Sequence, residues 1–215
     1  MDNNQTAFIA PEYANHSPLT WYQAALEQPV FIRDPSQEKA IEHLDELWTE
    51  LMMFKRKRNR FLGRSIRSPQ LPRGLFFYGG VGRGKSFLMD VFFGCLPYRR
   101  KRRVHFHAFM AEVHRRMKAL KGEPDPLKAV ANEIASEARV LCFDEFHVSD
   151  IADAMILGRL LENLFEQGVV LVATSNYAPS ELYPQGQNRS SFLPTIKLLE
   201  DNLIVLNVVG GEDYR

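Results

Sequence analysis

Gly79-Gly80-Val81-Gly82-Arg83-Gly84-Lys85-Ser86 matches the phosphate-binding pattern G-x-x-x-x-G-K-[ST] at every position. A short apolar run, 75–78, precedes this stretch, and apolar residues at helical spacing follow it from 87 to 92. The pattern therefore predicts a strand buried on both faces, a loop that binds phosphate, and a helix, in that order. Glycine-rich turns also occur as plain loops, but a Lys-Ser pair between a strand and a helix favours the phosphate-binding interpretation.

The residue types in this stretch suit a nucleotide and a magnesium ion. Glycines let the backbone curl so that its N-H groups point inward, and the following helix directs its positive N-terminal end at the same place. We expect Lys85 to reach the β- and γ-phosphates and the Ser86 hydroxyl to bind Mg²⁺. The predicted ligand is therefore a nucleoside triphosphate with its metal.

Polar residues follow two further apolar runs. Asp144 and Glu145 come directly after 140–143, and Asn176 follows the run 169–173. Ligands gather at the carboxyl ends of strands in open α/β sheets, so these side chains are predicted to face the phosphates. Asp144 would hold Mg²⁺ through a water, Glu145 would act as general base, and Asn176 would hold the attacking water or the γ-phosphate. Two carboxylates that merely solubilise a loop are the alternative.

Length and composition bound the protein class. The chain has 215 residues, 45% of them hydrophobic and 25% charged, with a formal net charge of +1. These values predict one α/β domain with an appended segment and no global bias toward nucleic acid or membrane. The two cysteines, Cys95 and Cys142, favour free thiols in a reducing compartment. With no signal-peptide pattern and no long apolar window, a cytoplasmic location is predicted.

Periodicity places the remaining elements. Helices are expected over 19–26, 36–54, 109–120, 127–136, 151–164 and 192–199, and strands over 75–78, 104–109, 140–145, 169–173 and 203–208. Asp34 or Ser36 and Asp150 are candidate N-caps, and Gly168 is a candidate C′ residue. In the expected strand 104–109, His105 and His107 share a face, but two histidines without a third ligand do not predict a zinc site.

Two basic runs, 55–60 and 99–103, are not explained by the phosphate-binding pattern. The first is predicted to be an exposed connector and the second a surface turn. A docking patch for an acidic partner or a nucleic acid is the alternative for the first run.

The motifs together resemble the ZapE family of AAA+-type cell-division ATPases, which has mitochondrial relatives. The resemblance rests on 79–86, 104–107, 141–146, 150–155, 173–176, Arg189 with 192–194, and 213–215. It implies a five-stranded parallel sheet of order 5-1-4-3-2, with ATP as the nucleotide. It also implies that Asn176 is the first sensor and Arg189 the arginine finger, although Asn188 stands where the family pattern has Gln.

The same resemblance implies a domain organisation and a partner. Residues 1–35 would form an N-terminal extension and 36–215 the ATPase domain, and the sequence ends before the helical lid and second sensor expected in the family. The implied function is remodelling of a protein partner, the FtsZ division ring, by a homo-oligomer. Two alternatives stay open: a nucleic-acid-associated ATPase such as a helicase loader, and a nucleotide-gated adaptor with little turnover.

Overall fold

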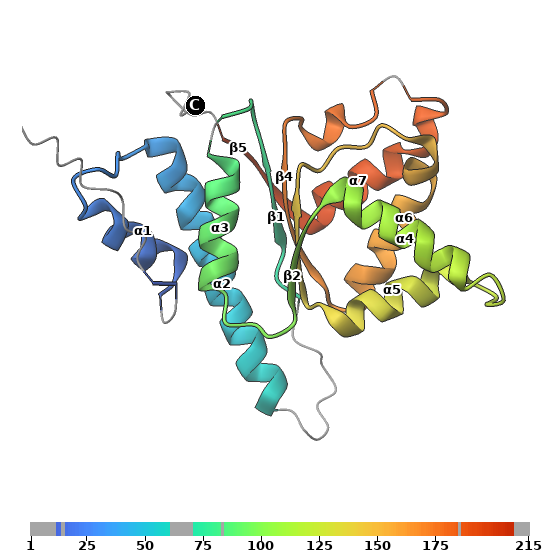
Figure 1. Ribbon diagram of the computed structural model, residues 1–215, viewed down its shortest axis with the longest axis horizontal. Coiled ribbons are helices and arrows are strands. Elements are labelled where there is room, and N and C mark those ends of the chain that lie inside the picture. Colours follow the sequence, from blue (N-terminus) through green and yellow to red (C-terminus); the bar gives the residue numbers. More distant parts are fainter. Residues whose placement is uncertain (1–11, 14–15, 61–70, 83, 185, 209–215) are drawn as a thin grey trace, which may run out of the picture.

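The core of the molecule is a five-stranded parallel sheet with helices on both faces (Figure 1). The computed structural model describes residues 12–13, 16–60, 71–82, 84–184 and 186–208, with the side chains of 57–60 left out. The strands are β1 (Gly74–Tyr78), β2 (Lys101–His105), β3 (Val140–Asp144), β4 (Val170–Ser175) and β5 (Leu203–Asn207). Their order, β2-β3-β4-β1-β5, is the predicted 5-1-4-3-2 read from the other edge, so the predicted topology is confirmed.

The helices form two layers (Figure 1). One face of the sheet carries α1 (Pro18–Leu26), α2 (Pro35–Arg60) and α3 (Lys85–Cys95). The other carries α4 (Phe106–Ala119), α5 (Pro126–Glu137), α6 (Ile151–Glu166) and α7 (Leu193–Asn202), with 3₁₀ turns at Pro179–Glu181 and Arg189–Ser191. Within the described ranges, no helix is both long and apolar enough to cross a membrane.

Alternation along the strands explains the two layers. Leu75 and Phe77 of β1 join the core beneath α1, α2 and α3, while Phe76 between them joins the core beneath α4 to α7. Strands β1, β3 and β4 are apolar on both faces because both faces are covered, as parallel sheets require. Because all five strands are parallel, their carboxyl ends lie along one edge of the sheet, here called the carboxyl edge.

Most elements lie close to their predicted positions, including the caps. Asp34 accepts the Ser36 N-H at 2.9 Å at the start of α2, and Asp150 accepts the Ala152 N-H at 2.6 Å at the start of α6. Gly168 has the left-handed φ of +78° expected of a C′ residue after α6.

The predicted strand 104–109 is wrong. Strand β2 ends at His105, and α4 begins at Phe106. One face of this helix is buried and includes Phe106, Phe109 and Val113. The burial of that face outweighs the strand preference of the residues from 106 to 109. His105 and His107 consequently belong to different elements and do not share a strand face.

The basic run 99–103 is also not a surface turn, because its last three residues form the first part of β2. Lys101 donates through Nζ to the carbonyl oxygens of Phe93 and, at 2.8 Å, of Leu96. Arg102 and Arg103 project to opposite faces of the strand and pair with carboxylates there. The positive charges of this run are used to join elements. The prediction that the run 55–60 is a connector is also wrong, because α2 continues through it to Arg60. Within this run, Lys55 donates to the Pro97 carbonyl at 2.8 Å.

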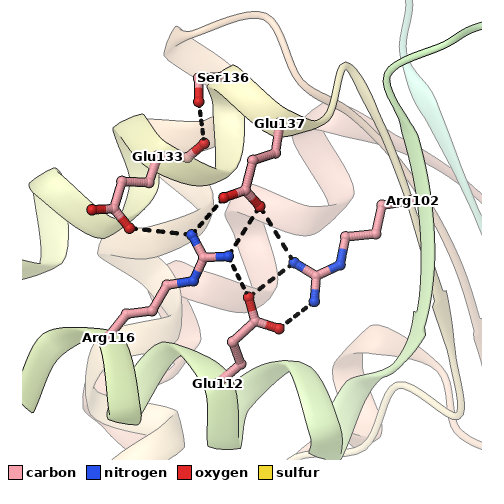
Figure 2. A network of polar contacts seen from close by, with 6 residues as sticks. All are labelled: Arg102, Glu112, Arg116, Glu133, Ser136 and Glu137. Atoms are coloured by element: carbon pink, nitrogen blue, oxygen red, sulfur yellow. Dashed lines mark hydrogen bonds and ion pairs between the residues drawn. The ribbon is translucent and has the colours of Figure 1, made fainter. Parts of the chain in front are cut away.

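Arg102 belongs to an ion-pair network that ties β2 to α4 and α5 (Figure 2). Arg102 donates to Glu112 at 3.0 Å, and Arg116 pairs with the same carboxylate at 2.7 Å. Arg116 also donates to Glu137 at 2.9 Å and to Glu133 at 3.1 Å. Hydrogen bonds from Arg102, together with the charge of Arg116, lower the pKa of Glu112. The network therefore stabilises the ionised form of Glu112.

Glu112→Gln is expected to lower stability at neutral pH by about 1 kcal/mol, a shift of about 2–4 °C in Tm. Because the folded-state pKa is lowered, this stabilisation is complete above the ordinary pKa of 4.5 and is lost as the pH falls below it. The difference in Tm between parent and variant should therefore shrink in acid, as thermal melts at pH 7 and pH 4 would measure. Glu123→Gln, at an exposed carboxylate between α4 and α5, is the matched control. A difference that grows in acid would contradict the assignment.

Helix α1 packs into the core although it lies in the segment 1–35. Trp21, Tyr22 and Ala25 are almost completely buried against residues of α2 and α3. Tyr13 stacks on Trp21 with ring centroids 5.3 Å apart. The division of the chain at residue 35 stays a prediction. Residues 1–11 and 213–215 lie outside the described residues.

Candidate nucleotide-binding site

The ends of three neighbouring strands are hydrogen-bonded together at the carboxyl edge. Strand β4 lies between β1, which leads into the phosphate-binding loop, and β3, which leads to Asp144. The Gly79 N-H donates to the Ser175 carbonyl at 3.3 Å, and the Ser175 hydroxyl donates to the Phe146 carbonyl at 2.7 Å. The stretch 79–86, called the phosphate loop below, is thus held in place relative to the carboxylates of β3.

Glycine is required at two positions of the phosphate loop. Gly84 is the N-cap of α3 with φ +76°, and a Cβ there would meet the Gln37 amide nitrogen at 2.6 Å. A Cβ on Gly79 would meet the Val208 carbonyl oxygen at 2.5 Å, and φ at Gly79 is +154°. Between them, Gly80, Val81 and Gly82 lead to Arg83, which lies outside the described residues. Any larger residue at Gly79 or Gly84 would distort the loop.

Lys85 and Ser86, the last two residues of the phosphate loop, are also the first two residues of α3. The Lys85 ammonium group donates to the carbonyl oxygens of Gly79 and Gly80, both at 2.7 Å. It therefore folds back over the start of the loop. The predicted roles of Lys85 and Ser86 stay predictions, and the position of both residues fits them.

Asp144 ends β3 and is 8% exposed. Its two carboxylate oxygens accept from Arg103, Oδ2 from Nε at 2.6 Å and Oδ1 from Nη2 at 3.2 Å. Arg103 also donates through Nη1 to Asp90 on α3. Burial by itself lowers the pKa of Arg103, but the hydrogen bonds to Asp144 and Asp90 raise it overall. Asp144, the predicted metal ligand, is thus already paired with the positive charge of Arg103.

Glu145 and Asn176 are exposed at the same edge. Glu145 has a left-handed backbone with φ +55°, and its N-H donates to the Thr174 hydroxyl at 3.3 Å. Its side chain is 81% exposed, with Oε2 3.8 Å from Nδ1 of His105. Asn176 directly follows β4, the strand that lies between β1 and β3. Both side chains are available to a ligand, as their predicted roles require.

Arg189 lies in a different setting. Its guanidinium donates to the carbonyl oxygens of Leu182 at 2.7 Å, Tyr183 at 2.8 Å and Ser180 at 2.7 Å. The residue therefore holds together the segment between β4 and α7 in its own chain. Its expected role as an arginine finger stays a prediction, and acting on a neighbouring subunit would require these hydrogen bonds to break.

A family model described as AFG1-like ATPase matches residues 16–215. This range covers nearly the whole chain, including the phosphate loop and both carboxylates of β3. The chain belongs to the AFG1-like ATPase family. The predicted resemblance to this ATPase family is thereby confirmed.

Two curated relatives show how far the likeness of this AFG1-like ATPase extends. It is 43% identical over 210 residues to cell division protein ZapE of Escherichia coli, covering 93% of this chain and 56% of ZapE. It is 48% identical over 158 residues to lactation elevated protein 1 homolog B of Danio rerio, covering 68% of this chain and 31% of that relative. The chain thus spans little more than half the length of ZapE.

Solved structures confirm the fold. Domain III of the replication initiation protein DnaA from Thermotoga maritima superposes with a TM-score of 0.57 at 18% identity. The match covers 85% of this chain and 66% of the DnaA domain. At this identity the likeness concerns architecture alone, and it confirms the α/β fold expected for this AFG1-like ATPase.

The donor set at the carboxyl edge of this AFG1-like ATPase fits Mg²⁺. Mg²⁺ takes oxygen ligands and keeps several waters, binding through one or two protein groups together with substrate phosphates. The Ser86 hydroxyl and the Asp144 carboxylate are oxygen donors of this kind. Among the described residues there is no cluster of three or more His, Cys, Asp or Glu side chains that could hold a metal ion.

Several residues that shape this site are not predicted from the sequence. Arg103 is predicted in a surface turn, whereas it contacts Asp144. Thr174 and Ser175, at the end of β4, form hydrogen bonds with the loop after β3. Gln37, 7% exposed on α2, packs its amide against Gly84. The alternation of β2 could have indicated Arg103, but only with the strand limits correctly placed.

Proposed function

We propose that this AFG1-like ATPase binds ATP together with Mg²⁺ at the carboxyl edge and hydrolyses it. The observation that carries the proposal is the arrangement of the phosphate loop, Asp144 and Glu145 around the end of one strand, β4. Phosphoryl transfer depends mainly on positioning and charge neutralisation, and these residues offer both. The family assignment supports ATP as the nucleotide.

Each residue has a role that follows from its place. Lys85 exchanges its contacts with the Gly79 and Gly80 carbonyls for contacts with the β- and γ-phosphates. Glu145, exposed and one residue beyond the metal ligand, accepts a proton from the attacking water. Asn176 orients that water or a γ-phosphate oxygen. Bound Mg²⁺, held by Ser86 and Asp144, would neutralise phosphate charge.

We further propose that hydrolysis remodels a protein partner in bacterial cell division, with the FtsZ ring as the candidate. The support is the 43% identity to cell division protein ZapE over 93% of the chain. Because the chain spans 56% of ZapE, the partner surface is proposed for the whole protein.

Steady-state ATP hydrolysis by the full-length protein, measured with FtsZ, with DNA and with neither, tests this proposal. FtsZ is expected to change turnover or to have its filaments altered in an ATP-dependent way. DNA-stimulated turnover that falls steeply with salt would instead support the nucleic-acid-associated alternative.

Arg189→Ala tests whether the site is completed by a neighbouring subunit. We propose a homo-oligomer in which Arg189 stabilises charge on the γ-phosphate bound to the adjacent phosphate loop. The variant should bind ATP but lose turnover by about 10³-fold, the effect of a guanidinium supplied by a partner. Mixing it with a Lys85→Ala variant should restore part of the activity, because some interfaces then pair an intact loop with an intact Arg189.

The hydrogen bonds of Arg189 within its own chain require a control. Loss of those three bonds should also lower Tm, which thermal melts would record. A purely structural role predicts lower stability with no rescue on mixing. Turnover that is independent of protein concentration, without rescue, would remove Arg189 from the neighbouring site.

A further inference from the structure

Two adjacent arginines of β2 serve opposite faces of the sheet. Side chains alternate along a strand, so Arg102 points toward α4 and α5, where it pairs with Glu112. Arg103 points toward α3, where it meets Asp90, and it reaches along the sheet to Asp144. Of these two arginines, Arg103 is the one that contacts the predicted metal ligand, Asp144.

The contact between Arg103 and Asp144 involves both oxygens of the carboxylate. The carboxylate receives two hydrogen bonds from one guanidinium, at 2.6 and 3.2 Å. The side chains are 23% and 11% exposed, so water screens the pair only in part. Asp90 holds the far nitrogen of Arg103 and links the same guanidinium to the helix that follows the phosphate loop. The Arg103 guanidinium is thus held by Asp144 of β3 on one side and by Asp90 of α3 on the other.

The charges at this edge bear directly on nucleotide binding. A partly buried Asp144 without a cation would repel the phosphates of ATP, and a divalent cation would relieve that repulsion. Arg103 already neutralises Asp144, so the repulsion is small even without metal. The same positive charge disfavours a second cation beside Asp144. Both effects make nucleotide affinity less dependent on Mg²⁺.

We propose that Arg103 is a positioning residue that sets the coupling between Mg²⁺ and nucleotide by holding and neutralising Asp144. Coupling here means the ratio of nucleotide affinities with and without Mg²⁺, which by linkage equals the effect of nucleotide on Mg²⁺ affinity. The inference rests on the proposed function, because it concerns the same site. In this proposal, the positive charge of Arg103 partly replaces that of Mg²⁺ when nucleotide binds without the metal.

Isothermal titration of the full-length protein with the non-hydrolysable analogue AMPPCP, in EDTA and in Mg²⁺, measures this ratio without relying on activity. Arg103→Gln should weaken binding in EDTA and raise the ratio by on the order of tenfold over the parent. Arg103→Lys, which keeps the charge but not the paired hydrogen bonds, should give an intermediate ratio. Arg102→Gln, the neighbour on the opposite face, should leave the ratio at the parent value.

A double variant shows whether Arg103 acts through Asp144. With Asp144→Asn present, Arg103→Gln should no longer change the ratio, because the carboxylate that it neutralises is gone. Equal ratios for the parent and Arg103→Gln would overturn the inference while leaving the nucleotide site intact. A parent protein that binds no AMPPCP in either buffer would overturn the proposed function as well. An Arg103→Lys ratio that exceeds the Arg103→Gln ratio would also contradict a role based on charge.

Discussion

Lys85→Ala is expected to abolish detectable ATP binding, weakening it by about 10²-fold or more. The ammonium group of Lys85 lies over the start of the phosphate loop, 2.7 Å from the carbonyl oxygens of both Gly79 and Gly80. The substitution removes the charge that would meet the phosphates. The two hydrogen bonds to the Gly79 and Gly80 carbonyls belong to the free state, because Lys85 is proposed to exchange them for contacts with the phosphates. The loss of the charge therefore accounts for the expected loss of binding.

Equilibrium titration with ATP and Mg²⁺ measures this effect. Lys197→Ala is the matched control, since Lys197 is an exposed residue of α7 that pairs with Asp201 at 3.0 Å. The control should bind ATP as the parent does. Unchanged affinity in Lys85→Ala would remove the phosphate-loop assignment.

Glu145→Gln should bind ATP nearly as the parent protein does and lose turnover by a factor on the order of 10² or more. Glutamine has almost the same size and can keep the backbone conformation of Glu145, but its amide cannot accept the proton of the attacking water. Because the side chain is 81% exposed, its replacement should leave stability almost unchanged. The defect is therefore expected in chemistry alone.

Phosphate release assays together with ATP titration separate the two steps. Glu166→Gln, at the last residue of α6 and exposed, is the matched control. This substitution removes a carboxylate that is remote in sequence from Glu145, so the control variant should hydrolyse ATP at the parent rate. Parental turnover in Glu145→Gln would show that another group is the base.

The central fold was predictable because its signals are local. The run 140–143 is apolar throughout, as a strand covered on both faces requires, and Asp144 follows it directly. Asp150 and Gly168 bracket α6 with chemistry that acts within one turn of the helix. The strand order, in contrast, came from the family resemblance, because local patterns do not specify which parallel strands are neighbours.

The contacts around Asp144 were not predictable, for a physical reason. The strand β2 is half-exposed along its first four residues and rich in Lys and Arg, so it lacks the apolar pattern that identifies a strand. Arg103 is stabilised there by Asp144 and Asp90, which lie 41 and 13 residues away in sequence. Such long-range pairing determines the structure of this segment, and composition alone indicates a solvated turn.

The contacts of Arg189 were not predictable from the sequence either. The family resemblance implies an arginine finger at this position. In the structure, its guanidinium binds three carbonyl oxygens of its own chain, in a segment that turns through a left-handed Tyr183. Backbone carbonyls exposed by an irregular turn are acceptors that a sequence pattern does not reveal.

The most direct test of the central account is a crystal structure of the full-length Glu145→Gln variant with ATP and Mg²⁺. The account predicts that the triphosphate lies in the phosphate loop, with Lys85 in contact with the β- and γ-phosphates. The metal should lie between the Ser86 hydroxyl and the Asp144 carboxylate. The γ-phosphate should face residue 145 and Asn176. A triphosphate bound elsewhere, or a metal remote from both Ser86 and Asp144, would contradict the account.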